Sequence, residues 1–239
     1  MDPGDVLVLF DIDGTLVRAG DPAHHEAFDD ALVAVFGVPA SIAGVPLAGR
    51  LDHQIAADAL AAHGVDEAEV AARLPQLAEA MGAGYAARVA PGARVARRLP
   101  GVPATLDRLV AAGIVLGIVT GNCEPVGRAK LVAAGIDDRF GPGGWGDHPV
   151  DRAGLVERAR AAAAAQHGRD VRSWSTWVVG DTPLDVEAAH RAGARALAVP
   201  TGVVGREQLA AAGPDELLDD LADAEAVLAA LLEVPGRAG

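Results

Sequence analysis

The stretch Val6–Phe10, with the acids that follow it, constrains the fold more than any other part of the chain. Its five residues are Val-Leu-Val-Leu-Phe, a pattern typical of a strand buried on both faces of a parallel sheet. Asp11 and Asp13 follow directly, and Gly14 comes next. Two carboxylates at the end of a buried strand are unfavourable unless something neutralises them. A divalent cation is the simplest candidate, because such ions take oxygen ligands.

The composition limits the classes of protein to which this chain can belong. Of its 239 residues, 51% are hydrophobic and 22% are charged, which allows a substantial core and argues against global disorder. The net charge of −13 argues against nucleic acid or an anionic membrane as the main partner, since both attract basic surfaces. The single cysteine, Cys123, fits a reducing compartment. The apolar run before Asp11 is too short for a signal peptide or a membrane span, so we expect a soluble cytoplasmic protein.

Residues 19–91, here called the helical insert, have a helical pattern throughout. We expect three segments, at about 22–36, 52–63 and 66–89. The last should be broken near Pro75, because proline cannot donate the helical hydrogen bond. Helices alone inside an otherwise alternating chain suggest a second, smaller domain. We therefore predict a core of residues 1–18 and 92–239, a helical domain at 19–91, and a return point at Pro91-Gly92.

From Pro103 onward, helices alternate with short apolar strands. Strands are predicted at about 114–119, 175–179 and 194–199, with weaker ones near 143–146 and 216–218. This alternation is typical of right-handed βαβ units, which form a parallel sheet covered by helices on both faces. We predict an α/β fold with a three-layer, Rossmann-like core and the all-helical insert after the first strand.

Polar residues follow three of the predicted strands. They are Asp11 and Asp13 after the first strand, Thr120, Gly121 and Asn122 after the second, and Asp181 and Asp185 after a later one. The carboxyl ends of parallel strands share one edge, where ligands bind. Carboxylates suit Mg²⁺, and backbone N–H groups before a helix can bind phosphate oxygens. A carboxylate beside a metal can attack phosphorus, and a second acid can move protons. The pattern predicts a magnesium-dependent phosphate site.

Three ordered motifs carry a resemblance to a known family. They read Phe-Asp-Ile-Asp-Gly-Thr-Leu at 10–16, Val-Thr-Gly-Asn at 119–122 and Val-Gly-Asp-Thr-Pro-Leu-Asp at 179–185. Their sequence and strand-end context resemble the first, second and fourth motifs of the haloacid dehalogenase superfamily. The helical insert resembles the helical cap of its phosphoglycolate phosphatase and β-phosphoglucomutase-like branch. The resemblance covers essentially the whole chain.

The resemblance implies a role for each matching residue. Asp11 would be the nucleophile and a Mg²⁺ ligand. Asp13 would be the general acid and base, with its backbone carbonyl on the metal. Thr120 would bind the transferring phosphoryl group. Asp181 would coordinate Mg²⁺, with Asp185 beside it, directly or through water. The presence of Asp13 favours phosphoryl transfer over dehalogenation.

The third motif departs from the family pattern, which usually shows lysine followed by proline. The corresponding region, 146–155, reads Gly-Asp-His-Pro-Val-Asp-Arg-Ala-Gly-Leu. Arg152 is the nearest cation and our first choice to neutralise Asp11 and the phosphoryl oxygens, because a guanidinium suits that task. Lys130, on the predicted helix after the second motif, is the alternative.

Residues of the helical insert are expected to contact the leaving group of the substrate and so determine specificity. Arg50 and His53, at the start of its second helix, are the substrate-binding candidates, with Asp52, Gln54, His24 and His25 nearby. Each could equally belong to a solvated helix surface. The insert is small, so we expect a small phosphorylated metabolite as substrate.

The sequence favours a Mg²⁺-dependent phosphatase that hydrolyses a small phosphate monoester, phosphoglycolate- or sugar-phosphate-like, through an aspartyl phosphate. A phosphomutase of the same branch is one alternative. A catalytically silent binding module on the same fold is another, because the third motif is unusual. We expect a monomer or homodimer that binds neither nucleic acid nor membrane.

Overall fold

A parallel sheet forms the centre of the molecule in a computed structural model that describes residues 3–89, 97–141, 143–148, 150–170 and 174–232. Within these residues, six strands are arranged in the order β3-β2-β1-β4-β5-β6, and every neighbouring pair is parallel. The strands are β1 (Val6–Phe10), β2 (Val115–Val119), β3 (Gly143–Gly144), β4 (Ser175–Gly180), β5 (Arg195–Ala198) and β6 (Glu216–Leu217). The predicted α/β fold is confirmed.

Helices cover both faces of this sheet. Val6, Val8 and Phe10 of β1 pack into one core, whereas Leu7 and Leu9 pack into another on the opposite face. This follows from the alternation of side chains along a strand. The first core is closed by α4 (Val102–Ala111), α5 (Glu124–Ala134) and α9 (Ala224–Leu232), and the second by α6 (Arg152–His167), α7 (Pro183–Arg191) and α8 (Arg206–Ala211). The result is the predicted three-layer core.

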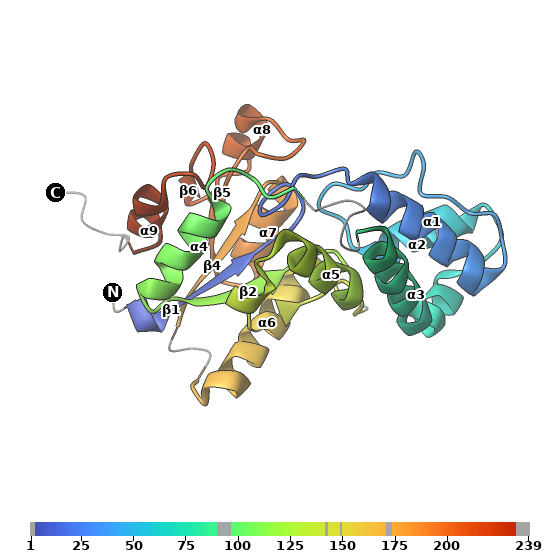
Figure 1. The fold of residues 1–239 in the computed structure, drawn as a ribbon, viewed down its shortest axis with the longest axis horizontal. Helices are drawn as coiled ribbons and strands as arrows, with labels where there is room; N and C mark the ends of the chain where they lie inside the picture. Colours follow the sequence, from blue (N-terminus) through green and yellow to red (C-terminus); the bar gives the residue numbers. More distant parts are fainter. Residues whose placement is uncertain (1–2, 90–96, 142, 149, 171–173, 233–239) are drawn as a thin grey trace.

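The helical insert lies at one end of the molecule, beyond the sheet (Figure 1). It contains α1 (Pro22–Phe36), α2 (Asp52–Ala61) and α3 (Glu67–Arg88), which share an apolar cluster that also includes Cys123 and Val126 at the start of α5. One of its contacts with the rest of the chain is between α3 and α5, where a Cβ on Gly82 would lie 2.4 Å from the side chain of Pro125. The division into domains remains a prediction, and the return point at Pro91-Gly92 lies outside the described residues.

The predicted break near Pro75 is wrong, because α3 runs without interruption from Glu67 to Arg88 with Pro75 inside it. Pro75 is exposed, while Leu74, Leu77 and Ala78 are buried. The carbonyl of Ala71, which loses its helical partner at Pro75, is on an exposed residue where water can replace the missing donor. Burial of the opposite face therefore outweighs the local cost of proline.

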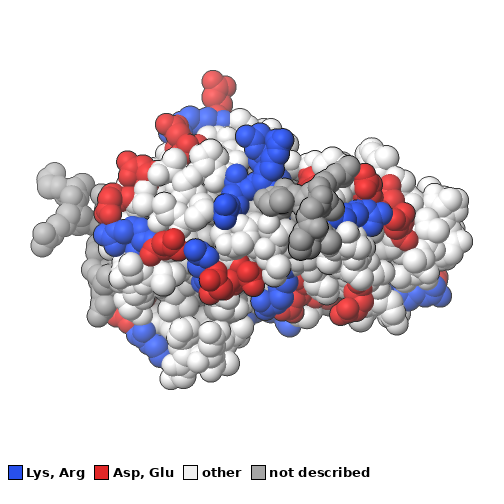
Figure 2. Space-filling model, in the orientation of Figure 1, with Lys and Arg blue, Asp and Glu red and all other residues white. Residues whose placement is uncertain are grey.

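The surface carries charges of both signs. Figure 2 shows one face, on which basic and acidic side chains are interspersed among residues of other kinds. Among the described residues, no helix combines the length and the apolar composition needed to cross a membrane.

Candidate active site

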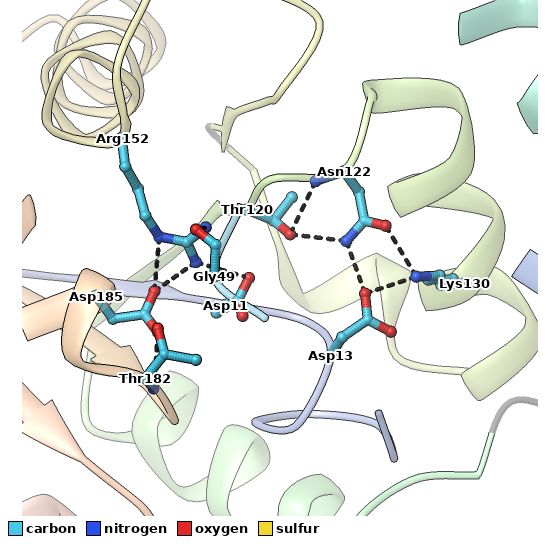
Figure 3. A network of polar contacts seen from close by, with 9 residues as sticks. All are labelled: Asp11, Asp13, Gly49, Thr120, Asn122, Lys130, Arg152, Thr182 and Asp185. Atoms are coloured by element: carbon cyan, nitrogen blue, oxygen red, sulfur yellow. Dashed lines mark hydrogen bonds and ion pairs between the residues drawn. The ribbon is translucent and has the colours of Figure 1, made fainter. Parts of the chain in front are cut away.

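Three neighbouring strands bring the predicted residues to one edge of the sheet. Strand β1 lies between β2 and β4, so Asp11, Thr120 and Asp181, each directly after its strand, lie close together (Figure 3 shows Asp11 and Thr120). All three are buried. The backbone N–H of Asp11 donates to Val179 O at 2.9 Å, which continues the pairing of β1 with β4 into the site.

Asp11, Asp181 and Asp185 form a group of buried carboxylates, here called the carboxylate triad. One oxygen of each lies within 4.8 Å of the others. Burial raises the pKa of Asp181 to about 9, and the charges of Asp11 and Asp185 add to this effect. Asp181 Oδ1 is buried and has no hydrogen-bond partner among the described residues. A compact set of buried carboxylates with an unpartnered oxygen fits a hard divalent cation such as Mg²⁺.

Two glycines fix the place of Asp181. A Cβ on Gly14 would lie 2.3 Å from Asp181 Oδ2, and a Cβ on Gly202 would lie 1.6 Å from it. Gly14 also has φ of +85°, which side chains other than glycine rarely adopt. Neither position can carry a side chain unless the Asp181 carboxylate moves.

Arg152 is the cation that faces Asp11, with Nη2 at 3.3 Å from Asp11 Oδ1. Its Nε donates to Asp185 Oδ1 at 2.8 Å, and Nη2 donates to the same oxygen (Figure 3). Its Nη1 donates to Gly49 O, in the helical insert, at 3.2 Å. Burial raises the pKa of Asp11 to about 7, and the charges of Asp185 and Asp13 add to this, although Arg152 opposes it. Arg152 thus connects the insert with two members of the carboxylate triad.

Asp13 lies in a different environment, because Lys130 faces it. The buried Lys130 Nζ donates to Asp13 Oδ2 at 2.6 Å, to Asn122 Oδ1 at 2.8 Å and contacts His24 Nδ1 at 3.0 Å. Asn122 Nδ2 also donates to Asp13 Oδ2, at 2.8 Å. Burial alone would raise the pKa of Asp13, but Lys130 and the two hydrogen bonds hold it below its usual value. The two candidate cations therefore face different carboxylates: Arg152 lies beside Asp11, and Lys130 beside Asp13.

The turn after β2, residues 120–123, carries the other predicted phosphate ligands. Thr120 N–H donates to Gly144 O at 3.0 Å, which fixes the turn against β3. Thr120 Oγ1 accepts from Asn122 Nδ2 at 2.8 Å. A Cβ on Gly121 would lie 2.0 Å from Arg50 O, so only glycine permits this close approach of the insert.

A cavity of about 370 Å³ opens onto these groups. Its walls include Asp11, Asp13, Thr120, Arg152 and Asp181 from the core, and His24, Phe28, Arg50 and Asp52 from the helical insert. Arg50 Nη1 also donates a hydrogen bond to Asp58 Oδ2 at 2.6 Å. His53 is not part of the cavity wall; its Nδ1 lies 3.2 Å from Gly146 O. Of the predicted catalytic, substrate-binding and metal residues, His53, Lys130 and Asp185 are outside this wall. Lys130 joins the site through Asp13, and Asp185 joins through Arg152 and the triad.

Sequence reasoning missed two features of the site. It assigned Asn122 only backbone N–H groups, whereas the Asn122 side chain connects Thr120, Asp13 and Lys130. It considered Lys130 only as a partner for Asp11. Lys130 lies in the second turn of α5 and Asn122 lies just before the N-cap residue of that helix, so both could face the start of α5, but nothing in the sequence indicated Asp13 as their common partner.

Comparisons with known proteins agree with this architecture. A sequence profile of the family described as haloacid dehalogenase-like hydrolase matches residues 8–190. A phosphoglycolate phosphatase from Rhodospirillum rubrum is 32% identical over 219 residues, which cover 90% of this chain and 87% of that protein. A phosphoglycolate phosphatase from Yersinia pestis is 31% identical over 226 residues and covers 90% of each chain.

Solved structures have the same fold. A predicted phosphoglycolate phosphatase from Haemophilus somnus superposes with a TM-score of 0.63 at 26% identity, covering 95% of this chain and 99% of that one. A β-phosphoglucomutase from Clostridium difficile gives a TM-score of 0.62 at 14% identity, covering 95% and 96%, which supports the fold alone. The chain therefore belongs to the haloacid dehalogenase-like hydrolases, in their phosphoglycolate phosphatase and phosphoglucomutase-like branch.

Proposed function

We propose that this phosphatase hydrolyses a small phosphate monoester, of the phosphoglycolate or sugar-phosphate kind, through an aspartyl phosphate on Asp11. The observation that carries the proposal is the contrast between two acids two residues apart. Asp11 lies in the carboxylate triad beside Arg152, whereas Asp13 is bound by Lys130 and Asn122. Two carboxylates in such different surroundings suit separate roles as nucleophile and proton carrier. The relatives named phosphoglycolate phosphatase support this substrate class.

The metal proposed for this site is Mg²⁺, held by the carboxylate triad and the backbone carbonyl of Asp13. The unpartnered Oδ1 of Asp181 supports this choice. Bound Mg²⁺ would neutralise charge on the triad and on the phosphoryl oxygens. In that state Asp11 is ionised and available for attack despite its burial.

The reaction then takes two steps. An oxygen of Asp11 bonds to phosphorus, the bond from phosphorus to the leaving oxygen breaks, and Asp13 gives that oxygen a proton. Water next attacks phosphorus and gives a proton to Asp13, and the bond between phosphorus and Asp11 breaks to release phosphate. Arg152 and Thr120 hold the phosphoryl oxygens in both steps.

The surroundings of Asp13 favour its ionised form, which is the form that accepts a proton from water. In the first step Asp13 must carry a proton. The approach of a negatively charged phosphoryl group favours protonation of Asp13, because like charges disfavour its ionised form. Lys130 therefore sets the resting state of Asp13 rather than that of Asp11.

The helical insert, residues 19–91, is proposed to be a separate domain that covers the site and excludes water during the reaction. The cavity of about 370 Å³ limits the substrate to a small molecule. Arg50 would contact the leaving group from the cavity wall.

A panel of small phosphate monoesters, assayed with and without Mg²⁺, tests this function. We expect Mg²⁺-dependent release of free phosphate from phosphoglycolate or a sugar phosphate, and loss of turnover in Asp11→Asn, which cannot attack. Isomerised sugar phosphate without free phosphate would instead support a phosphomutase. No turnover of any ester with Mg²⁺ present would contradict the proposal.

Substitution of each cation separates the roles of Arg152 and Lys130. Arg152→Ala should lower kcat by about 100- to 1,000-fold, the usual cost of losing one group that stabilises the transition state. Arg158→Ala, an exposed arginine on the same helix α6, is the matched control and should retain activity. If Lys130→Ala abolished turnover while Arg152→Ala retained it, the assignment of Arg152 to Asp11 would be wrong.

A further inference from the structure

Asp52 is a buried acid of the helical insert that contacts the turn after β2. It is the first residue of α2 and is 2% exposed. Its backbone N–H donates to Gly121 O at 2.8 Å, and its Oδ2 accepts from the backbone N–H of Cys123 at 2.8 Å. These two bonds hold the turn on both sides of Asn122.

The same carboxylate lies at the start of two helices. Cys123 is the N-cap residue of α5, and its own side chain makes no capping hydrogen bond. Asp52 accepts from the backbone N–H of this N-cap residue, one of the donors at the start of α5 that have no partner within the helix, while it also begins α2. Helix N-termini favour negative charge, which offsets part of the cost of burying the carboxylate. Asp52 is therefore bonded to a specific partner, Cys123, and is not part of a solvated helix surface.

The turn is enclosed tightly around these contacts. A Cβ on Gly121 would lie 2.0 Å from Arg50 O, and a Cβ on Gly146 would lie 1.9 Å from Gly121 O. The insert and the loop after β3 therefore meet the turn from two sides. Any movement of residues 50–52 must alter the surroundings of Gly121.

We infer that Asp52 is a positioning residue that holds the phosphate-binding turn, residues 120–123, in its active arrangement only while the helical insert is seated on the core. The inference rests on the proposed function, which assigns the phosphoryl group to this turn. Asp52 acts through Gly121 and Cys123, and the turn carries Asn122, whose Nδ2 donates to both Asp13 Oδ2 and Thr120 Oγ1. Binding of a phosphoryl group and seating of the insert then favour each other.

The first test compares Asp52→Ala with two other variants in the Mg²⁺-loaded protein. Asp52→Ala should weaken the affinity for inorganic phosphate, measured by calorimetry, and lower kcat/KM by about 10- to 100-fold, since misplaced groups near the reacting atoms have effects of that size. Asp52→Asn should recover most of both, because its amide oxygen can accept from Cys123. Asp66→Ala is the matched control: it removes the N-cap of α3, where Asp66 Oδ1 accepts from Glu69 N–H at 2.8 Å, away from the turn.

The control separates a loss of position from a loss of stability. Both alanine variants should lower Tm, but Asp66→Ala should keep the phosphate affinity and kcat/KM of the unmodified protein. The inference would be overturned if Asp66→Ala lost as much phosphate affinity and kcat/KM as Asp52→Ala. It would also be overturned if the phosphate affinity of Asp52→Ala stayed within twofold of that of the unmodified protein.

A second test needs no substitution, so it remains decisive even if Asp52→Ala does not fold. Inorganic phosphate should slow amide hydrogen exchange at Gly121–Cys123 and, together with it, at Asp52, which bonds to Gly121 O. Protection limited to the turn would contradict the coupling. If no monoester is hydrolysed but the two sites still become protected together, the proposed function fails and the coupling stands.

Discussion

At the scale of single residues, the site depends on the place of a few carboxylates. The sequence predicts that Asp11 and Asp13 meet Asp181 and Asp185, because all follow strands of one parallel sheet. The structure shows that Asp181 is packed between Gly14 and Gly202. Gly14 is part of the first motif and could be expected to matter. Gly202 comes from a distant loop, and nothing in its local sequence indicates that it contacts Asp181.

Gly202 therefore offers a sharp prediction about the carboxylate triad. In Gly202→Ala, the new Cβ would overlap Asp181 Oδ2, so we expect Mg²⁺ affinity and kcat to fall by about 10- to 100-fold, as for groups that orient a metal ligand. Gly205→Ala is the matched control, since a Cβ there meets no atom within 4 Å. Calorimetric titration with Mg²⁺ measures the difference. Equal affinity in the two variants would show that the site tolerates displacement of Asp181.

At the scale of elements, the strands and the three helices of the insert begin and end within a few residues of their predicted bounds. These predictions hold where local signals agree with burial, as in β1, which is apolar throughout, and in α1, where Asp21 caps the helix before Pro22. Helix α3 shows the limit of local reasoning. Its buried face keeps the helix intact through Pro75. Whether that face is buried cannot be predicted from the neighbouring residues alone.

Removal of the proline should stabilise α3. Pro75→Ala restores an N–H donor inside the helix, so we expect the free energy of unfolding to rise by about 1–3 kcal/mol. Urea unfolding followed by circular dichroism measures this change, with Gln76→Ala as a control at the next exposed position. A decrease in stability would mean that the helix has adapted its geometry to the proline.

At the scale of the whole molecule, burial and charge make the site unstable without a cation. Burial raises the pKa of Asp11 to about 7 and that of Asp181 to about 9, from the usual 3.8. At a pH above 3.8 and below these raised pKa values, the folded protein holds more protons at Asp11 and Asp181 than the unfolded chain does. Their contribution to the free energy of unfolding therefore falls as the pH rises from about 4 to about 9.

Thermal unfolding should reveal this pH-dependent loss of stability in the metal-free protein. With a chelator present, Tm should be lower at pH 8.5 than at pH 5.5, and the difference should shrink in Asp181→Asn, which removes one charge from the triad. Mg²⁺ at 100 times its dissociation constant at pH 8.5 should add about 2.7 kcal/mol of stability at that pH. The same Mg²⁺ concentration should add less at pH 5.5, where protons compete for the ligands. A Tm that is independent of pH and of Mg²⁺ would contradict the proposed metal site.

The sequence by itself determined the α/β fold and the acids at the strand ends. An apolar run identifies a buried parallel strand locally, and carboxylates directly after it are costly to bury unless a cation neutralises them. Only the tertiary structure decided how the cations are shared, with Arg152 at Asp11 and Lys130 at Asp13. It also decided that Asp52 bonds to the turn after β2. Those choices depend on how α5, α6 and the helical insert pack over the sheet edge, and distances between elements are set by packing rather than by spacing along the chain.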